Sequence, residues 1–473
     1  MYINGEWLKD GPTFSVYDPA TGETLDDVFD GNDGHAHLAI EAAARVQQSW
    51  ANQTAYQRSE LLYRAHGLML ERQSNLANLM TREQGKPLKA AMNEVKYAAD
   101  FLLWFAEEAK RVYGETIPSA RSDQRFLVHK QAIGVVAAIT PWNYPISMLT
   151  RKLGPALAAG CTVVLKPAET TPLCAMAVFE ILHEAGFPAG VANLVTTSEP
   201  KPIGDVFCTH PSVKKLTFTG STAVGKHLAQ AAAPQLKRVS MELGGHAPFI
   251  VFDDADPVHA AKGVSLVKFL NTGQACISPN RIFVQRRILE PFLATLQDRV
   301  SKLRAGNGLD PDNSIGPLIN EAAILKVDRQ VQDAVAKGAT LLSGGTRLSD
   351  GELAKGHFYG ATLLSNVTAE MLIYREETFG PVAAVVPFDD EDDVIAMAND
   401  THYGLAAYLY TQNLSRALRT FEQLQFGIIG INDINPTSAA APFGGMKESG
   451  LGREGAREGI EEYLETKLGG LSI

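Results

Sequence analysis

Short apolar runs and stretches with helical spacing alternate along most of the chain. Residues 35–114 carry apolar positions at helical spacing with few breakers, which predicts a mainly helical segment. Residues 125–131 (RFLVHKQ) alternate between apolar and polar, which predicts a strand or one arm of a hairpin. From residue 132 onward, apolar runs are separated by helical segments. These runs span residues 133–140, 161–167, 191–197 and 213–220. Such a rhythm predicts a doubly wound parallel sheet in an α/β fold.

The same alternation starts again after residues 241–256. Its apolar runs span residues 281–285, 381–388 and 426–432. A second doubly wound α/β domain is therefore expected. The connection near Glu242 to Gly245 is a plausible boundary, because paired glycines permit a sharp change of direction.

Composition narrows the class of protein. The 473 residues are 45% hydrophobic and 20% charged, with a formal net charge of −10. No long basic run is present, which argues against nucleic acid as a main partner. The N-terminal stretch MYINGEWLKDG lacks the apolar core of a secretory signal, and no apolar run reaches the roughly 18 residues of a membrane span. We expect a cytoplasmic protein without a membrane partner.

The four cysteines differ in their surroundings. Their spacing matches no zinc or CxxC pattern, so no metal site is expected. Cys161, Cys174 and Cys208 are expected to be buried structural residues, as free cysteines usually are. Cys276 lies in NTGQACISPN among turn-forming residues, where a nucleophile can be reached by a substrate. A structural role for Cys276 stays open on local composition alone.

Two further residues follow apparent strands. Glu242 in MELGG is either a solvated loop carboxylate or a general base that deprotonates water. Asn143 lies in the rigid turn PWNYP, at the carboxyl edge of a parallel sheet where ligands usually bind. Its amide is either an ordinary turn residue or a donor to a developing oxyanion.

Two motifs suggest a dinucleotide site. In FTGSTAVG, Gly220 and Ser221 precede a helix, and helix N-termini bind phosphates through free N–H groups. In KPAE, Lys166 suits ribose or phosphate, and Glu169 suits the two ribose hydroxyls. Each of these residues alone is more often a surface residue, and FTGSTAVG is not the GxGxxG fingerprint.

Together these groups suit the oxidation of an aldehyde. A thiolate adds to the carbonyl, an amide stabilises the oxyanion, a hydride leaves for nicotinamide, and a carboxylate activates the water that hydrolyses the thioester. A nucleophile, an oxyanion donor, a base and a dinucleotide pocket all have candidates in the sequence.

At this point the chain resembles the NAD(P)-dependent aldehyde dehydrogenase superfamily over its full length. The motifs that carry the resemblance occur in family order: TPWNYP, KPAE, FTGST, MELGG, GQAC, EETFGP (376–381) and PFGGMKESGLGREG (442–455). The resemblance implies Cys276 as nucleophile, Glu242 as base and Asn143 as oxyanion donor. It also implies a set of cofactor-binding residues: Lys166 and Glu169 at the ribose, Trp142, Gly220 and Ser221 near the pyrophosphate, and Glu377 and Phe379 at the nicotinamide half.

The resemblance further implies three structural units. These are an NAD-binding domain (1–114 and 132–242), a catalytic domain (243–440) and a β oligomerisation arm (115–131 and 455–473). Homodimers or homotetramers are usual in the superfamily. Glu169 favours NAD over NADP, since its carboxylate would repel a 2′-phosphate.

Within the superfamily the chain is most similar to succinate-semialdehyde dehydrogenases. Such enzymes are expected to hold the distal carboxylate with an arginine eight residues after the asparagine, which Arg151 matches, and with a serine where Thr437 stands. A second arginine is replaced by Leu270, so another anionic aldehyde, such as sulfolactaldehyde, is an alternative substrate. Ser278 replaces a second cysteine, so no redox switch is expected.

Other interpretations remain. Arg151 followed by Lys152 is also typical of a solvated helix face. A CoA-acylating relative would tend to lack the base, and a non-catalytic relative would tend to lack the cysteine or the base. Both residues are present here.

Overall fold

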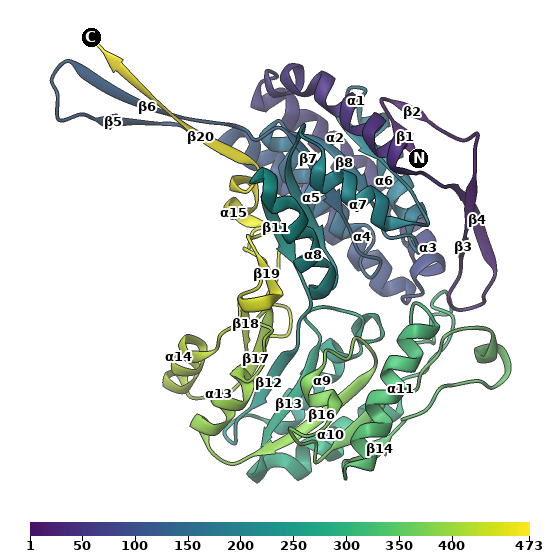
Figure 1. The fold of residues 1–473 in the computed structure, drawn as a ribbon. Coiled ribbons are helices and arrows are strands. Elements are labelled where there is room, and N and C mark those ends of the chain that lie inside the picture. The colour runs from purple at the N-terminus through teal and green to yellow at the C-terminus, as the bar shows by residue number, and fades with distance from the viewer.

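The computed structural model describes all 473 residues as an α/β protein with two sheet-containing lobes and an arm (Figure 1). Each lobe is built around one mainly parallel sheet, as the alternation of apolar runs and helical segments predicts. The two predicted sheets and the predicted strand at residues 125–131 are confirmed.

The upper lobe in Figure 1 holds an eight-stranded sheet. Its five central strands are parallel, and the short strands at its edges are antiparallel. In spatial order they are β19 (Gly450–Leu451), β11 (Arg238–Glu242), β10 (Val213–Thr219), β7 (Val135–Ile139), β8 (Thr162–Lys166), β9 (Ala192–Leu194), β1 (Tyr2–Ile3) and β2 (Glu6–Trp7).

Helices cover both faces of this sheet because its strands are apolar on both sides. Val136 packs into one core and its neighbour Ala137 into the other, as the two-residue period of a strand requires. The first core contains α2 (Ala55–Glu71), α3 (Gln73–Gln84), α4 (Leu88–Glu108), α5 (Ser147–Ala159) and α6 (Pro172–Ala185). The second contains α1 (Asp33–Ala51), α7 (Pro200–Thr209) and α8 (Thr222–Ala232). The predicted helical segment 35–114 thus corresponds to α1–α4.

The lower lobe holds a seven-stranded sheet that is parallel except at one edge. Its strands, in spatial order, are β14 (Thr340–Ser343), β15 (Thr362–Ser365), β16 (Val382–Phe388), β13 (Pro279–Gln285), β12 (Ala247–Val251), β17 (Ala406–Tyr410) and β18 (Ile428–Ile431). Its helices are α9 (Pro257–Lys268), α10 (Leu289–Ser301), α11 (Glu321–Ala336), α12 (Leu372–Arg375), α13 (Glu391–Asn399) and α14 (Leu414–Gln423).

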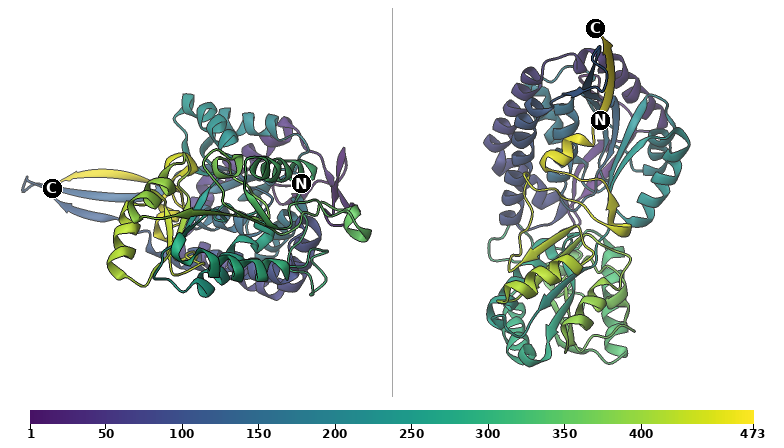
Figure 2. Two further views of the ribbon diagram at one scale, coloured as in Figure 1. Left: turned by 90° about the horizontal axis from the view of Figure 1, so that it is seen from below. Right: turned by 90° about the vertical axis from the view of Figure 1, so that its left-hand side faces the viewer.

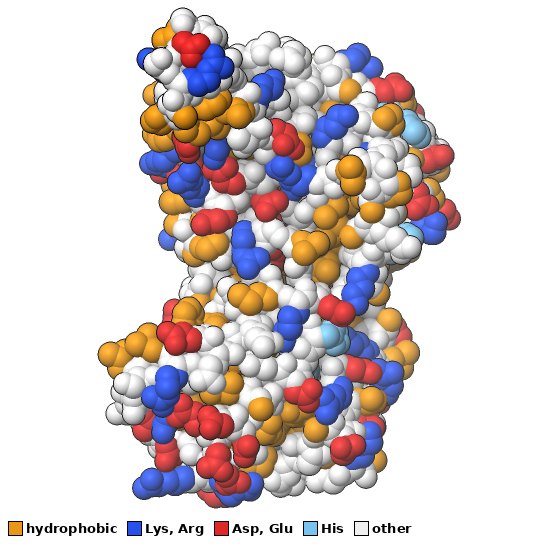
Figure 3. Space-filling model, turned by 60° about the vertical axis from the view of Figure 1, so that its left-hand side comes forward, with side chains coloured by type: hydrophobic (Ala, Val, Ile, Leu, Met, Phe, Trp, Pro, Cys, Tyr) orange, Lys and Arg blue, Asp and Glu red, His pale blue; other side chains and the backbone are white.

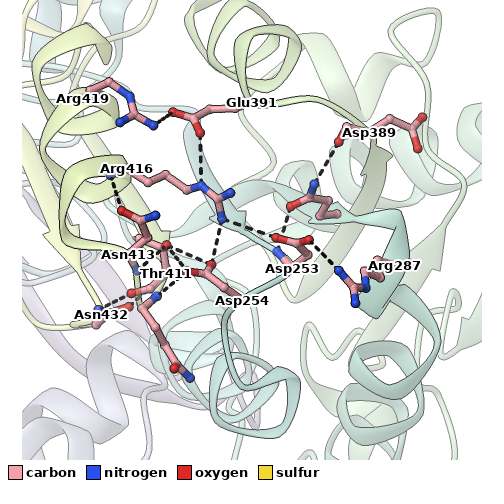
Figure 4. A network of polar contacts seen from close by, with 12 residues as sticks. Asp253, Asp254, Arg287, Asp389, Glu391, Thr411, Asn413, Arg416, Arg419 and Asn432 are labelled. Carbon is pink, nitrogen blue, oxygen red and sulfur yellow. Dashed lines mark hydrogen bonds and ion pairs between the residues drawn. The ribbon is translucent and has the colours of Figure 1, made fainter.

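The carboxyl edge of this second sheet is closed by ion pairs (Figure 4). Arg416 on α14 contacts Asp253 at 3.4 Å, Asp254 at 3.0 Å and Glu391 at 3.1 Å. Asp253 and Asp254 follow β12, which begins at the junction of the lobes, so this network lies at the end of β12 remote from that junction. The arginine therefore ties the loop after β12 to α13.

The arm is a three-stranded antiparallel sheet of β5 (Glu115–Pro118), β6 (Gln124–Ala132) and β20 (Leu464–Ser472). It projects from the upper lobe, and Figure 1 and the left view of Figure 2 show it standing clear of the two lobes. The preceding helix α15 (Ala456–Glu461) packs with α4 and α5 through Ile460. The division into three units with the predicted boundaries stays a prediction.

The sequence patterns gave no indication of a hairpin near the N-terminus. Strands β3 (Thr13–Tyr17) and β4 (Thr24–Phe29) pair antiparallel on their own. Their apolar positions are few and partly exposed, so hydrophobic periodicity gives only a weak signal there.

Candidate active site

Two cavities meet at Cys276, at the junction of the two lobes. One has a volume of about 350 Å³ and lies between the α8 end of the upper lobe and residues 377–379. The other has a volume of about 510 Å³ and lies between α4, α5 and the segment 434–443. Cys276 and Met148 line both. A constriction between the lobes is visible on the molecular surface (Figure 3).

The loop that carries Cys276 has an unusual backbone. Asn271 (φ 50°), Thr272 (φ 57°) and Gly273 (φ 75°) are three consecutive left-handed residues between α9 and β13. Non-glycine residues rarely adopt this conformation, and such strain is concentrated at functional sites. A Cβ on Gly273 would overlap the carbonyl oxygen of Gly380, which explains the glycine in GQAC.

The Cys276 thiol lies in a protected environment. Its pKa is raised to about 12, mainly by burial and also by the nearby carboxylates of Glu377 and Glu242, although Arg151 and a backbone N–H act in the opposite direction. The thiol is thus the resting form near neutral pH. The other three cysteines are unpaired and buried, as predicted.

Asn143 is positioned beside the cysteine loop. Its side-chain nitrogen donates to the carbonyl of Gln274 at 3.0 Å, and its own carbonyl accepts from Asn271 at 2.9 Å. Asn143 is buried and lines the smaller cavity together with Cys276. Its side-chain amide is therefore held against the loop that carries Cys276.

Glu242 ends β11 and is fully buried, which excludes the solvated-loop interpretation. Burial raises the pKa of its carboxyl well above the ordinary value, Glu454 raises it further, and Arg151, Lys152 and Arg453 lower it. Its side chain lines neither cavity. The next residues lead into the second lobe, where a Cβ on Gly245 would overlap the carbonyl oxygen of Cys276.

The smaller cavity brings together most of the cofactor-site candidates. Its lining includes Trp142, Gly220, Ser221, Glu377 and Phe379. Ser221 caps the N-terminus of α8, accepting from Val224 at 3.4 Å, and the helix N-terminus suits an anionic group.

Aromatic and acidic side chains also line this cavity. The rings of Trp142 and Phe379 meet edge-to-face with centroids 5.5 Å apart. Glu377 accepts from the Gly245 N–H at 2.9 Å, which fixes its carboxylate. A helix N-terminus, an aromatic wall and a fixed carboxylate together have the chemistry that suits a dinucleotide.

Two cofactor candidates lie outside that lining. Lys166 ends β8 and is buried, and its ammonium pairs with the Glu169 carboxylate at 3.0 Å. The side chain of Glu169 is 45% exposed. Lys166 and Glu169 thus contact each other, but neither of them lines the smaller cavity.

The larger cavity contains the substrate candidates. Arg151, Thr437 and Leu270 all line it, and most of the remaining wall is apolar. The interpretation of Arg151 and Lys152 as a solvated face was wrong. Every residue of α5 is buried, because this helix lies between the sheet, α4 and the C-terminal segment.

A comparison with known proteins agrees with this geometry. The aldehyde dehydrogenase family profile matches residues 7–468. The chain belongs to the aldehyde dehydrogenase family. It is therefore an aldehyde oxidoreductase, with the fold of that family.

This aldehyde dehydrogenase is similar to several named proteins and to solved structures. A probable succinate-semialdehyde dehydrogenase [NADP(+)] from Sinorhizobium fredii is 52% identical, covering 97% of this chain and 93% of that protein. A 3-sulfolactaldehyde dehydrogenase from Pseudomonas putida is 50% identical, covering 99% and 97%. A crystal structure of an NADP-dependent enzyme from Escherichia coli superposes with a TM-score of 0.97 at 50% identity, covering 100% and 98%.

The aldehyde dehydrogenase contains buried polar residues near the site to which sequence analysis gave no role. Lys86 pairs with Glu94, and its ammonium also donates to the Asn143 carbonyl at 2.8 Å. Glu454 binds Arg151 and Lys152. Glu454 lies in the motif PFGGMKESGLGREG, whereas Lys86 lies in none of the motifs quoted above. Their pairing partners are distant in sequence and could not be inferred.

The structure has neither a metal-binding cluster nor a membrane-spanning helix. No cluster of three or more His, Cys, Asp or Glu side chains is placed to hold a metal ion. None of the helices combines the length and apolar character needed to cross a bilayer.

Proposed function

We propose that this aldehyde dehydrogenase oxidises a small anionic aldehyde to the carboxylate with NAD, through a thioester on Cys276. The observation that carries the proposal is the position of Cys276. It lies where the cavity suited to a dinucleotide meets the cavity suited to a small substrate. A substrate whose carbonyl carbon lies at this junction can reach the Cys276 sulfur and a cofactor bound in the smaller cavity.

In the first step the Cys276 sulfur bonds to the aldehyde carbon and its proton is released. The negative charge passes to the carbonyl oxygen, where the Asn143 amide and a backbone N–H stabilise it. Preorganised donors of this kind cost no reorganisation during the reaction. The amide of Asn143 is already held against the cysteine loop.

Loss of a hydride from this adduct, which bound NAD would accept, leaves a thioester on Cys276, and in the second step this thioester is hydrolysed. Glu242 takes a proton from water, the water oxygen bonds to the acyl carbon, and the carbon–sulfur bond breaks to release the acid and the thiol. A buried carboxylate with a raised pKa is a stronger base than an exposed one. Glu242 thereby favours hydrolysis over acyl transfer to CoA.

For the cofactor, we propose that Ser221, Gly220 and Trp142 hold the phosphate region and that Glu377 and Phe379 hold the nicotinamide half. Lys166 and Glu169 hold the adenosine ribose. When bound, NAD accepts the hydride that the aldehyde loses. The exposed carboxylate of Glu169 supports NAD over NADP. The Sinorhizobium fredii relative is named for NADP(+), so this preference needs a direct test.

For the substrate, we propose that Arg151 binds the anionic group and that Thr437 contributes a hydroxyl. The names of the two relatives, which act on a carboxylate-bearing and a sulfonate-bearing aldehyde, support an anionic substrate. Leu270 leaves the larger cavity with one arginine, which favours a substrate other than succinate semialdehyde. A sulfonated aldehyde is the alternative.

For assembly, we propose that the arm joins subunits into a homodimer or homotetramer in the cytoplasm. Its strands expose apolar side chains: Ile117, Leu127, Leu468, Leu471 and Ile473. Exposed apolar groups on a projecting sheet are typical of an interface. Four unpaired cysteines suit a reducing compartment.

The proposed function is tested by NADH formation with a panel of C2–C6 aldehydes, neutral and anionic, with both cofactors. We expect turnover by the wild type, none by Cys276→Ala, and an acyl-enzyme on Cys276 alone by mass spectrometry. The variant should bind NAD and keep its fold. Substantial turnover by Cys276→Ala would reject the mechanism, a requirement for CoA would favour acyl transfer, and no turnover at all would favour a non-catalytic role.

A further inference from the structure

A buried ion pair holds the turn that carries Asn143. Lys86 lies between α3 and α4, Glu94 lies on α4, and only 1% of each of these two side chains is exposed. The Lys86 ammonium pairs with Glu94 and also donates to the main-chain carbonyl of Asn143 at 2.8 Å. It lies 4.0 Å from the ring centroid of Tyr144. The contacts of this ammonium are thus made with Glu94 and with the turn.

The Glu94 carboxylate fixes the other end of the same turn. Its Oε1 accepts from the backbone N–H groups of Ile146 and Ser147, both at 3.1 Å, while its Oε2 accepts from Lys86. These N–H groups belong to the start of α5, where a carboxylate is a favoured acceptor. The ion pair therefore holds the backbone both before and after Pro145.

The orientation of the Asn143 backbone determines where its side-chain amide points. The Asn143 carbonyl accepts from Asn271 at 2.9 Å as well as from Lys86, and the Asn143 amide donates to the carbonyl of Gln274 at 3.0 Å. One of the two N–H groups of the amide is thus bound to the cysteine loop, and the other remains for an oxyanion. The direction of this second N–H depends on the donors that hold the Asn143 carbonyl.

Stability alone does not account for a buried ion pair at this place. Taking two charges out of water is costly, and apolar side chains of similar volume are often as stable as the pair they replace. Lys86 is also fixed at its main chain by the lower lobe. A Cβ on Gly308 would overlap the Lys86 carbonyl oxygen, and the Gly308 carbonyl accepts from the Leu88 N–H at 2.9 Å. The ammonium therefore joins the Asn143 turn to a backbone segment that is itself held in place.

We propose that Lys86 is a positioning residue for oxyanion stabilisation. With Glu94 as its partner, Lys86 fixes the Asn143 peptide so that the second N–H of the side-chain amide faces the carbonyl oxygen of a substrate on Cys276. Lys86 and Glu94 line the larger cavity, but Lys86 acts through Asn143 and not on the substrate itself. This inference rests on the proposed function, because it requires Asn143 to stabilise the oxyanion.

A double-mutant cycle between Lys86→Met and Asn143→Ala tests the inference. The rate of NADH formation in the first turnover is measured with succinate semialdehyde and with propanal at saturating NAD. Loss of one oxyanion donor costs roughly 100- to 1000-fold, and we expect a loss of this size for Asn143→Ala. Lys86→Met should lower the rate at least about tenfold, because it allows the donor to move.

Two further readouts separate positioning from a general structural role. The half-saturating concentration of aldehyde should not change in Lys86→Met, because the lost interaction is made only in the transition state. In the Asn143→Ala background, Lys86→Met should lower the rate no further, because the donor that it positions is already absent. General damage to the structure would lower the rate in both backgrounds.

Lys215→Met is the matched control. Lys215 is also a buried lysine of the upper lobe, but it contacts Ser240 and Glu462 and lines neither cavity. Its loss should leave the first-turnover rate and the affinity for NAD unchanged.

A second variant keeps the test decisive if Lys86→Met does not fold. Lys86→Met alone leaves the Glu94 carboxylate buried without its cation, which is strongly destabilising. Lys86→Met/Glu94→Gln removes both charges and keeps an oxygen acceptor for the N–H groups at the start of α5. We expect the same loss of rate for this variant, and again no further loss in the Asn143→Ala background.

Three outcomes would overturn the inference. These are a wild-type first-turnover rate after loss of Lys86, a loss that multiplies with that of Asn143→Ala, and a raised half-saturating aldehyde concentration as the main effect. The last outcome would make Lys86 a substrate-binding residue. A wild-type rate in Asn143→Ala would remove Asn143 from the mechanism and the role of Lys86 with it. No NADH from the wild type with either aldehyde would instead reject the proposed function.

Discussion

Gly245 packs directly against Cys276, so that a methyl group on its Cα would overlap the carbonyl oxygen of the cysteine. Gly245 follows β11 of the upper sheet, whereas Cys276 precedes β13 of the lower sheet. The Gly245 N–H also donates to Glu377 at 2.9 Å. Through these two contacts, Gly245 joins the segment after Glu242 to the loop that carries Cys276 and to the wall of the smaller cavity.

We predict that Gly245→Ala displaces the cysteine loop and reduces kcat by at least about 100-fold, since a misplacement of about 1 Å has that cost. The measurement is the pre-steady-state rate of NADH formation. Gly338→Ala is a useful control, because Gly338 has open space around its Cα, although its positive φ introduces some backbone strain. A Gly245→Ala enzyme with wild-type rates would show that the loop tolerates the displacement.

Glu242→Gln should separate the two chemical steps. If Glu242 is the base for deacylation, the variant still forms NADH rapidly in the first turnover and then releases acid slowly, giving a burst. Stopped-flow measurements of NADH detect both phases. An unchanged steady-state rate would remove Glu242 from the mechanism.

The reactivity of Cys276 without cofactor should depend steeply on pH. Because burial raises its pKa to about 12, the thiolate fraction should increase about tenfold per pH unit through the neutral range. We therefore expect the rate of alkylation by iodoacetamide to increase without a plateau between about pH 7 and about pH 10. Mass spectrometry assigns the site, and a plateau near pH 8 would mean that the resting thiol is already activated.

Cofactor choice should depend on Glu169. The wild type is predicted to prefer NAD, and Glu169→Ser should raise kcat/KM for NADP because it removes the repulsion of a 2′-phosphate. The loss of the ion pair with Lys166 also frees that ammonium for the phosphate. Steady-state kinetics with both cofactors measure the ratio, and a wild-type preference for NADP would show that Glu169 does not face the ribose.

Arg151→Ala should lower kcat/KM for the best anionic aldehyde by at least about tenfold more than for propanal. A desolvated, charge-assisted contact contributes roughly 2–4 kcal/mol, but part of the Arg151 charge is already shared with Glu454. Equal losses with both aldehydes would make Arg151 purely structural. A wild-type preference for neutral aldehydes would reject an anionic substrate.

Leu270→Arg is the complementary gain-of-function variant for this prediction. Leu270 lines the larger cavity and is 45% exposed, so a longer side chain has room toward solvent. A second arginine should raise kcat/KM for succinate semialdehyde more than for propanal. No gain would indicate that the anionic end of the substrate does not approach this wall.

The sequence by itself determined the two parallel sheets, their helices and most of the site candidates. Strands that are buried on both faces have continuous apolar runs, which are visible in the sequence. In motifs such as GQAC and MELGG, the reactive residue and the glycines around it are close together in the chain, so each motif can be recognised by itself. The positions of Cys276 and Asn143 could be predicted because each lies at the end of a strand or in a rigid turn. The N-terminal hairpin β3–β4 has no such pattern and was not foreseen.

Only the tertiary structure decided the environments of the charged residues. From the sequence, Arg151 and Lys152 have the pattern of a solvated face, yet both are buried and bind Glu454, about 300 residues away in the chain. Burying two adjacent cations is tolerated only when a carboxylate compensates them, and a linear pattern carries no information about a partner so distant in the chain. The proton affinities of Glu242 and Cys276 depend on the same distant charges, so they too follow from the fold.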